Sequence, residues 1–307
     1  MYLSYSILNL TYFPRGNYMD CQLQKLDKFI NIEGLYTFFY FEHDTNYFFP
    51  GEQHNFWEMV YVDRGEISAV EENTGYLVQQ GELIFHKPNA FHTLASSPKE
   101  PHNILVVTFA TQSPAMDFFK NKVFTLNHKQ KKILSLILEE MRNALTSGTL
   151  DNKKGYNGQI CDIASYQLGI AHLEHLLIEL LRDNSVIERN ENERKIARKN
   201  IENALVDSIK NHLQENIYNN IQLQEICSHY NLSKSYICEA FHKETGRSVI
   251  DYYIDLKIKE AKYLIRKGSL NFTQISEKLG YASIHHFSRS FKTKTGMSPS
   301  TYEKSIR

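Results

Sequence analysis

The sequence has no run of apolar residues long enough to cross a membrane, and its N-terminus has no basic stretch followed by an apolar one. A spanning helix needs about 18 apolar residues, so we expect neither a membrane segment nor a secretory signal. Cysteine is scarce as well, and the four cysteines form no C-x-x-C pair and no zinc-site spacing. We therefore expect a cytoplasmic protein with reduced thiols.

Neither sign of charge is in excess, because 35 Lys and Arg residues balance 35 Asp and Glu residues. Taken alone, this balance argues against a nucleic-acid binder. The charges are unevenly distributed, however: residues 251–307 contain 11 Lys or Arg against 5 Asp or Glu, a surplus of 6. A basic C-terminal end has the sign that contact with DNA phosphates requires.

Short runs of aromatic and β-branched residues, separated by turn signals, predict β structure for the first ~110 residues. The runs are 35–41, 57–62, 76–78, 83–85 and 104–109. Strands at this spacing favour a sandwich or a barrel. The pattern then becomes helical over 126–145 and 159–182, with a polar break at 146–158.

The second of these helices carries an apolar stripe that includes Leu173, Leu177 and Leu180. Such a stripe must be buried. Its partner is either the β domain or a second copy of the chain, and both can apply. Residues 185–200 are almost wholly polar and charged, which indicates a linker between two domains.

From about residue 201 onward the sequence repeats itself. Shifted by 50 positions, residues 233–253 align with 283–303. The identical pairs are Ser233/Ser283, Phe241/Phe291, Thr245/Thr295, Gly246/Gly296, Ser248/Ser298 and Tyr252/Tyr302. A repeat of this length is a supersecondary unit that is used twice.

Each copy has the pattern helix, tight turn, helix. N-cap oxygens satisfy free N–H groups, and glycine adopts the left-handed conformation that ends a helix. These signals are Ser233 and Gly246 in the first copy, and Asn271 or Thr273, Gly280, Ser283 and Gly296 in the second. They predict helices at 223–230 and 233–245, and a second recognition helix from residue 283 to about 295.

The last helix of each copy has one apolar face, which contains Phe241 in the first and Phe291 in the second. The opposite face of the second copy carries His285, Arg289 and Lys292. A helix-turn-helix needs this division, because the polar side reaches bases and phosphates in the major groove. One polar face alone equally fits a solvated surface; two copies joined by an amphipathic helix favour DNA reading. That connecting helix would span roughly 27 Å, comparable to the ~34 Å between successive major-groove faces.

This C-terminal segment resembles the AraC/XylS family of bacterial regulators over about 100 residues. The resemblance is carried by Leu279-Gly280-Tyr281, Phe287-Ser288-Arg289-Ser290-Phe291-Lys292 and Gly296-Met297-Ser298-Pro299 with Tyr302. It implies a seven-helix module with two recognition helices. The DNA-contacting positions it implies, together with the polar faces above, are Ser233, Lys234, Ser235, Cys238, Glu239, His242, Ser283, Ile284, His285, Arg289 and Lys292.

Within this set, Arg289 is the best candidate for a bidentate contact to guanine. Three positions depart from the family pattern: Lys257 and Glu303 replace an expected Arg, and Glu239 is acidic. Glutamate accepts from cytosine N4 but repels phosphate. We therefore expect the first unit to bind DNA more weakly than the second.

The N-terminal half resembles the cupin-like sensor domain that is often joined to this module. The residues that carry the resemblance are His54, Glu58, Val60-Tyr61-Val62, Gly65, Gly81-Glu82-Leu83-Ile84, Pro88 and His92. The resemblance and the aromatic side chains suggest an effector site formed by His54, Trp57, Glu58, Tyr61, His86 and His92. Because His54 lacks a second His two residues later, we expect neither a metal ion nor another cofactor.

The sequence therefore predicts a mixed, two-domain fold. A β-barrel or cupin-like sandwich with appended helices (1–120 and a helical dimerisation segment, 121–184) precedes a linker (185–200) and an all-α double helix-turn-helix domain (201–307). The expected function is bacterial transcription regulation without enzyme activity. The expected partners are double-stranded DNA, a small-molecule effector such as a carbohydrate, a second copy of the chain and, for an activator, RNA polymerase. The alternative is a metal-dependent cupin enzyme fused to a DNA-binding module.

Overall fold

The computed structural model describes residues 23–45, 47–97, 100–145, 162–183 and 186–306. The predicted polar break at 146–158 lies outside these residues, as do Cys21 and Cys161. The described cysteines, Cys227 and Cys238, are free thiols. No helix in the described ranges is both long and apolar enough to cross a membrane.

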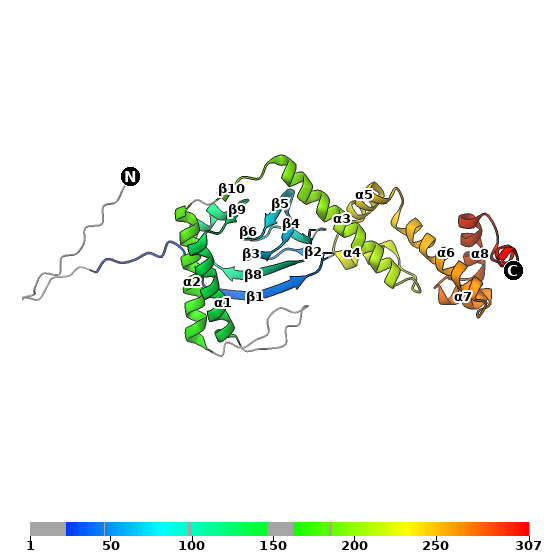
Figure 1. The fold of residues 1–307 in the computed structure, drawn as a ribbon, viewed down its shortest axis with the longest axis horizontal. Helices are drawn as coiled ribbons and strands as arrows, with labels where there is room; N and C mark the ends of the chain where they lie inside the picture. The colour runs from blue at the N-terminus through cyan, green and yellow to red at the C-terminus, as the bar shows by residue number, and fades with distance from the viewer. Residues whose placement is uncertain (1–22, 46, 98–99, 146–161, 184–185, 307) are drawn as a thin grey trace, which may run out of the picture.

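The N-terminal domain consists of two antiparallel sheets (Figure 1). The larger has the strand order β1-β8-β3-β6-β9-β10 and the smaller β2-β7-β4-β5. The strands are β1 Gly34–His43, β2 Phe48–Glu52, β3 Trp57–Arg64, β4 Glu66–Glu71, β5 Thr74–Gln79, β6 Glu82–His86, β7 His92–Ser96, β8 His102–Ala110, β9 Val123–Thr125 and β10 Val186–Ile187. The five predicted strands are present, whereas β2, β4, β7, β9 and β10 were not predicted.

Strand β3 shows how the larger sheet serves two cores at once. Successive side chains of a strand point to opposite faces. Trp57, Met59 and Tyr61 therefore pack on the outer face of the sheet, and Val60 and Val62 face the smaller sheet. The interior between the sheets receives side chains from both.

Two helices, α1 His128–Ala144 and α2 Ile163–Asp183, lie side by side and cover the outer face of the larger sheet (Figure 1). The predicted stripe on α2 packs there, with Leu173, Leu177 and Leu180 almost fully buried. A short 3-10 helix, η1 Pro114–Phe119, adds Phe119 to the same core. Of the two partners considered for the stripe, the β domain is the one that the structure provides.

Helix α3 Glu191–Glu215 connects the two domains (Figure 1). Its first turns occupy the segment predicted to be a linker, so this polar stretch is helical instead. The physical reason is local: Asn190 and Glu193 form a capping box, and one face, including Ala197 and Ile201, is buried although the rest is polar. The helix packs against β4 and β5 of the smaller sheet.

The C-terminal domain repeats one unit twice, as the sequence predicted. The first unit pairs α4 Leu223–Tyr230 with α5 Lys234–Thr245, and the second pairs α7 Phe272–Lys278 with α8 Ile284–Thr295. Helix α6 Val249–Lys267 joins them, and α9 Pro299–Ile306 follows. With α3, this makes seven helices in residues 191–306.

The predicted helix ends are confirmed. Ser233 and Ser283 accept hydrogen bonds from the backbone N–H groups of Tyr236 and His286, both at 3.2 Å. The left-handed stops are Gly246 and Gly296, with φ of 69° and 79°. Each unit has its own core, built around Phe241 in the first and Phe287 and Phe291 in the second.

We expect Gly75→Ala to weaken the docking of α3 on the sensor domain. A Cβ at Gly75 would overlap the carbonyl oxygen of Arg194 and lie 3.2 Å from the Ala197 side chain. Overpacking of this kind typically costs about 1–3 kcal/mol of unfolding free energy. Urea denaturation measures this loss. Gly34→Ala is the control, because its nearest neighbour would be 3.6 Å away; equal stability of the two variants would contradict the docking described here.

Candidate functional site

The candidate DNA-reading surface consists of the outward faces of α5 and α8, which lie apart from each other and are joined through α6 (Figure 1). Most of the DNA-contacting residues predicted from the sequence are exposed there. The exposed ones are Ser233, Lys234, Ser235, Glu239, His242, Ser283, His285, Arg289 and Lys292, while Cys238 and Ile284 are half-buried. The two serines also cap their helices, so their side-chain oxygens are already engaged in local structure.

The two units differ in the cations that they leave available. On α8, Arg289 and Lys292 are exposed and form no ion pair with any described residue. On α5, the ammonium of Lys243 is held by Glu202 of α3 at 2.6 Å, and Glu239 adds a negative charge to the exposed face. The second unit therefore has the more basic exposed surface.

Lys257, which stands where the resemblance leads one to expect Arg, is almost fully buried in α6. Its ammonium donates hydrogen bonds to the backbone carbonyls of Asn219 and Leu279, and lies 4.7 Å from the ring centroid of Tyr253. Burial lowers its pKa to about 8. Lys257 thus ties the loop before the first unit to the turn of the second, a structural role that the sequence pattern did not reveal.

The second candidate site is a cavity of about 570 Å³ between the two sheets. Its walls are aromatic and aliphatic over most of their area, and its polar end contains Glu58, His86 and His92, three of the residues predicted to form the effector site. The lining residues include Phe39, Phe41, His43, Tyr47, Phe49, Glu52 and Phe56, none of which was predicted. They were missed because the sequence of an interior-facing aromatic strand resembles that of an ordinary core strand.

Trp57 and Tyr61 were predicted to line the effector site, and the structure places them elsewhere. Both belong to the core beneath α1 and α2, with 5% and 6% of their surface exposed. They occupy odd positions of β3, whereas Glu58 and Val60 are the even positions that face the cavity. The prediction for Trp57 and Tyr61 was wrong because successive side chains of a strand point to opposite faces of the sheet.

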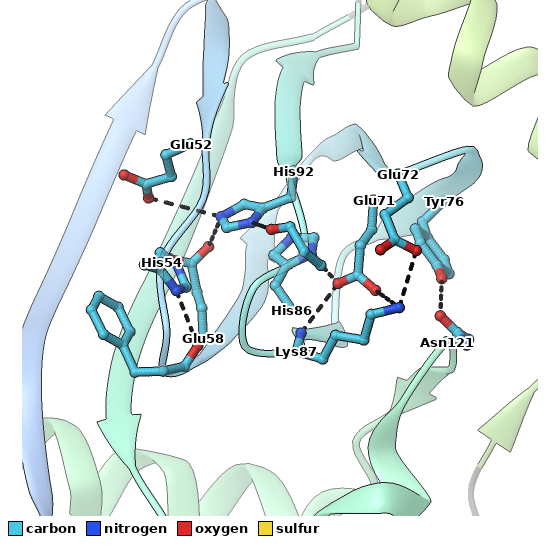
Figure 2. A network of polar contacts seen from close by, with 12 residues as sticks. Glu52, His54, Glu58, Glu71, Glu72, Tyr76, His86, Lys87, His92 and Asn121 are labelled. Carbon is cyan, nitrogen blue, oxygen red and sulfur yellow. Dashed lines mark hydrogen bonds and ion pairs between the residues drawn. The ribbon is translucent and has the colours of Figure 1, made fainter.

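The polar end of the cavity is a buried network, shown in Figure 2. The carboxylate of Glu58 lies 3.6 Å from Nε2 of His54 and 3.5 Å from Nε2 of His92, and Glu52 lies 3.8 Å from the same His92 nitrogen. The ring of His92 stacks on that of His86 at 4.2 Å. Nδ1 of His86 in turn lies 3.1 Å from Glu71.

The network shifts the pKa of its members in opposite directions. Burial raises the pKa of Glu58, but His54 and His92 outweigh it and hold this pKa well below its usual range. Burial lowers the pKa of His92, yet Glu52 and Glu58 outweigh it and bring it to about 10. His86 keeps a lowered pKa because burial dominates there. The cluster therefore concentrates charge inside an otherwise apolar cavity.

A third feature is a cavity of about 450 Å³ at the junction of the two domains. It lies between the smaller sheet, α3 and the start of α5, and its lining includes Phe48, Phe91, Arg198 and Tyr236. Nη1 of Arg198 donates to the carbonyl of Asn73 at 3.1 Å. Arg198 thus ties α3 to the sensor domain beside this cavity.

Two family models match the two halves of the chain. The model of AraC-like ligand-binding domains matches residues 34–113, and a model of helix-turn-helix domains matches residues 226–305. Together with the cavity and the repeated units, these matches define the chain as a two-domain transcription regulator with a ligand-binding domain. Its two matched domains are of the kinds found in AraC-type regulators.

Other transcription regulators are similar to this chain over most of its length. The HTH-type transcriptional regulator YdiP of Escherichia coli is 23% identical over 267 residues, which cover 81% of this chain and 79% of that protein. The MmsAB operon regulatory protein of Pseudomonas aeruginosa is 25% identical over 83% of this chain and 78% of its own length. Among solved structures, the C-terminal domain of AraT from Geobacillus stearothermophilus is 25% identical, with a TM-score of 0.32, over 33% of this chain and 84% of its own.

We expect His102, beside the cavity, to make stability depend on pH. Its ring is fully buried with Nδ1 3.0 Å from the Ser96 hydroxyl, and burial lowers its pKa to about 4. The unfolded chain takes up a proton below pH 6.5 whereas the folded chain does so only near pH 4, so stability is lost as the pH falls through this window.

The loss due to His102 is at most of the order of 3 kcal/mol. It is measured by thermal unfolding at pH 4 to 7 of the wild type and His102→Asn, in which this part of the dependence should disappear. His128→Asn, with an exposed ring, is the control. If Tm falls with pH equally in the wild type and in His102→Asn, His102 is not the cause of the pH dependence.

Proposed function

We propose that this regulator binds a specific operator through α5 and α8, and that a small molecule in the cavity between the sheets modulates its occupancy. The observation that carries the DNA part is the pair of capped recognition helices with an exposed Arg289. Arginine forms two hydrogen bonds to guanine O6 and N7 in the major groove. Since α8 has the more basic face, the second unit supplies most of the phosphate attraction.

The cavity supports the effector part of the proposal. Its volume of about 570 Å³ suits a ligand of small-molecule size, because such sites usually occupy 300–1,000 Å³. Aromatic rings such as Phe39, Phe41 and Tyr47 offer flat apolar faces, and the Glu58–His92 end offers charge and hydrogen bonds. A sugar combines an apolar ring face with hydroxyl groups, so a carbohydrate is the effector class that we propose.

The route from effector to DNA is proposed to run through the smaller sheet. Phe49 of β2 faces the cavity, while its neighbour Phe48 packs on Tyr230 of α4, with ring centroids 6.3 Å apart. A shift of β2 on effector binding would therefore move the first reading unit. Altered operator occupancy, or altered contact with RNA polymerase, follows from a changed position of α5.

The DNA proposal is tested by selection from random duplexes. We expect the wild type to enrich a motif with elements about ten base pairs apart, because the units would reach successive major-groove faces. Arg289→Ala should weaken binding to that motif by about 1–3 kcal/mol. Arg142→Ala removes the same charge from an exposed position on α1, in the other domain, and should leave binding unchanged. Enrichment of no motif at low salt, with or without candidate sugars, would contradict the proposal.

We also propose that the chain forms a homodimer through the outward side of α2. The buried stripe of α2 is already used, but Ile163 and Leu168 remain 77% and 49% exposed. Leu168→Glu should then shift the sedimentation coefficient from dimer to monomer, while Ser269→Glu in the other domain should not. A wild type that sediments as a monomer at micromolar concentration would rule out this interface.

A further inference from the structure

Two histidines at the polar end of the cavity are held in the same orientation by backbone carbonyls. Nδ1 of His54 lies 3.0 Å from the carbonyl oxygen of Phe56, and Nδ1 of His92 lies 3.1 Å from that of Ala90. A carbonyl oxygen only accepts hydrogen bonds, so Nδ1 must carry the proton in both rings. Each ring therefore turns its Nε2 atom toward the interior of the cluster.

Both of these Nε2 atoms face carboxylates. Nε2 of His54 and of His92 are buried, and among the described residues neither has a hydrogen-bond partner. They lie 3.6 and 3.5 Å from the two oxygens of Glu58, which is 6% exposed. A buried carboxylate is costly without a nearby positive charge, which either a proton on Nε2 of His92 or a bound metal ion supplies. The arrangement therefore calls for positive charge between these atoms.

The separations suit a metal ion better than protons. A charge-assisted N–H···O bond is about 2.7–2.9 Å long, shorter than any of the three N–O distances of 3.5, 3.6 and 3.8 Å. Ligands bound at about 2.0–2.2 Å around a tetrahedral ion are roughly 3.3–3.6 Å apart. The donor atoms of Glu52, His54, Glu58 and His92 all lie within 4.8 Å of one another.

We propose that Glu52, His54, Glu58 and His92 bind one divalent transition-metal ion, of which Zn²⁺ and Co²⁺ are suitable examples. Two imidazoles and carboxylates suit such ions, and two carboxylates neutralise the charge of one. This revises the expectation of no metal, which rested on the absence of a second His after His54. The residue two positions before His54 is Glu52, which supplies the further ligand instead.

The surroundings of the site resemble those of established metal centres. A ligand His usually donates its second N–H to a carbonyl or carboxylate, as His54 and His92 do here. His86 stacks on His92 and holds its ring in place. Glu52 and His92 come from the smaller sheet and Glu58 from the larger, so a bound ion would join the two sheets. Glu52 is the half-exposed ligand, with 49% of its side chain accessible, and is the one that a solute oxygen would replace.

The test titrates Co²⁺ into untagged full-length protein that has been treated with a chelator and desalted. We expect one equivalent to produce the visible absorption of tetrahedral Co²⁺, which Zn²⁺ then removes by displacement. Because binding favours the folded state, saturating Zn²⁺ should also raise Tm by roughly 5 °C. Neither readout involves DNA or effector, so this inference stands or falls separately from the proposed function.

Variants locate the ion. Glu58→Gln and His92→Asn should weaken Co²⁺ binding at least ~100-fold, since each removes a direct ligand. His43→Asn is the matched control, because it removes another unpartnered imidazole from the same cavity and should bind one equivalent as the wild type does. Circular dichroism checks that each variant is folded. Absence of a saturable spectrum in the wild type would overturn the proposal, as would an unchanged spectrum in folded Glu58→Gln.

Discussion

The docking of α3 on the smaller sheet is the constraint on which the arrangement of the molecule depends. One helix of 25 residues contributes Ala197 to the sensor domain contact and Leu205, Val206 and Ile209 to the core of the first reading unit. A continuous helix transmits orientation because its hydrogen bonds fix every residue relative to the next. The position of α5 is therefore set by how closely α3 approaches Gly75.

The polar cluster and this docking contact share a hairpin, which gives the two domains a physical connection. His92 stacks on His86, which lies 3.1 Å from Glu71 at the end of β4. Lys87 then joins Glu71 to Glu72 in the turn that leads to Gly75 (Figure 2). The buried network at His92 therefore extends to the hairpin that supports α3.

The C-terminal domain must hold its two similar units in one fixed geometry. Lys257 does so from within α6, since its buried ammonium is satisfied by carbonyls belonging to both units. Lys294 of α8 is likewise held by Asp255 of α6 at 2.9 Å. On α8, Lys294 is paired with α6, while Arg289 and Lys292 are exposed and form no ion pair with any described residue. On α5, Lys243 is paired with Glu202 of α3. The repeat is thus symmetric in fold and asymmetric in charge.

The sequence by itself determined the repeat, its caps and its recognition helices, because capping and turn formation depend on residues three or four positions apart. It also identified His54, Glu58 and His92 as members of one site. Only the tertiary structure decided that Trp57 and Tyr61 belong to the core, that Glu52 joins the histidines, and that residues 191–200 are part of a docked helix. Each of these depends on which face of an element meets a distant neighbour, and a local pattern of polar and apolar residues does not specify that neighbour.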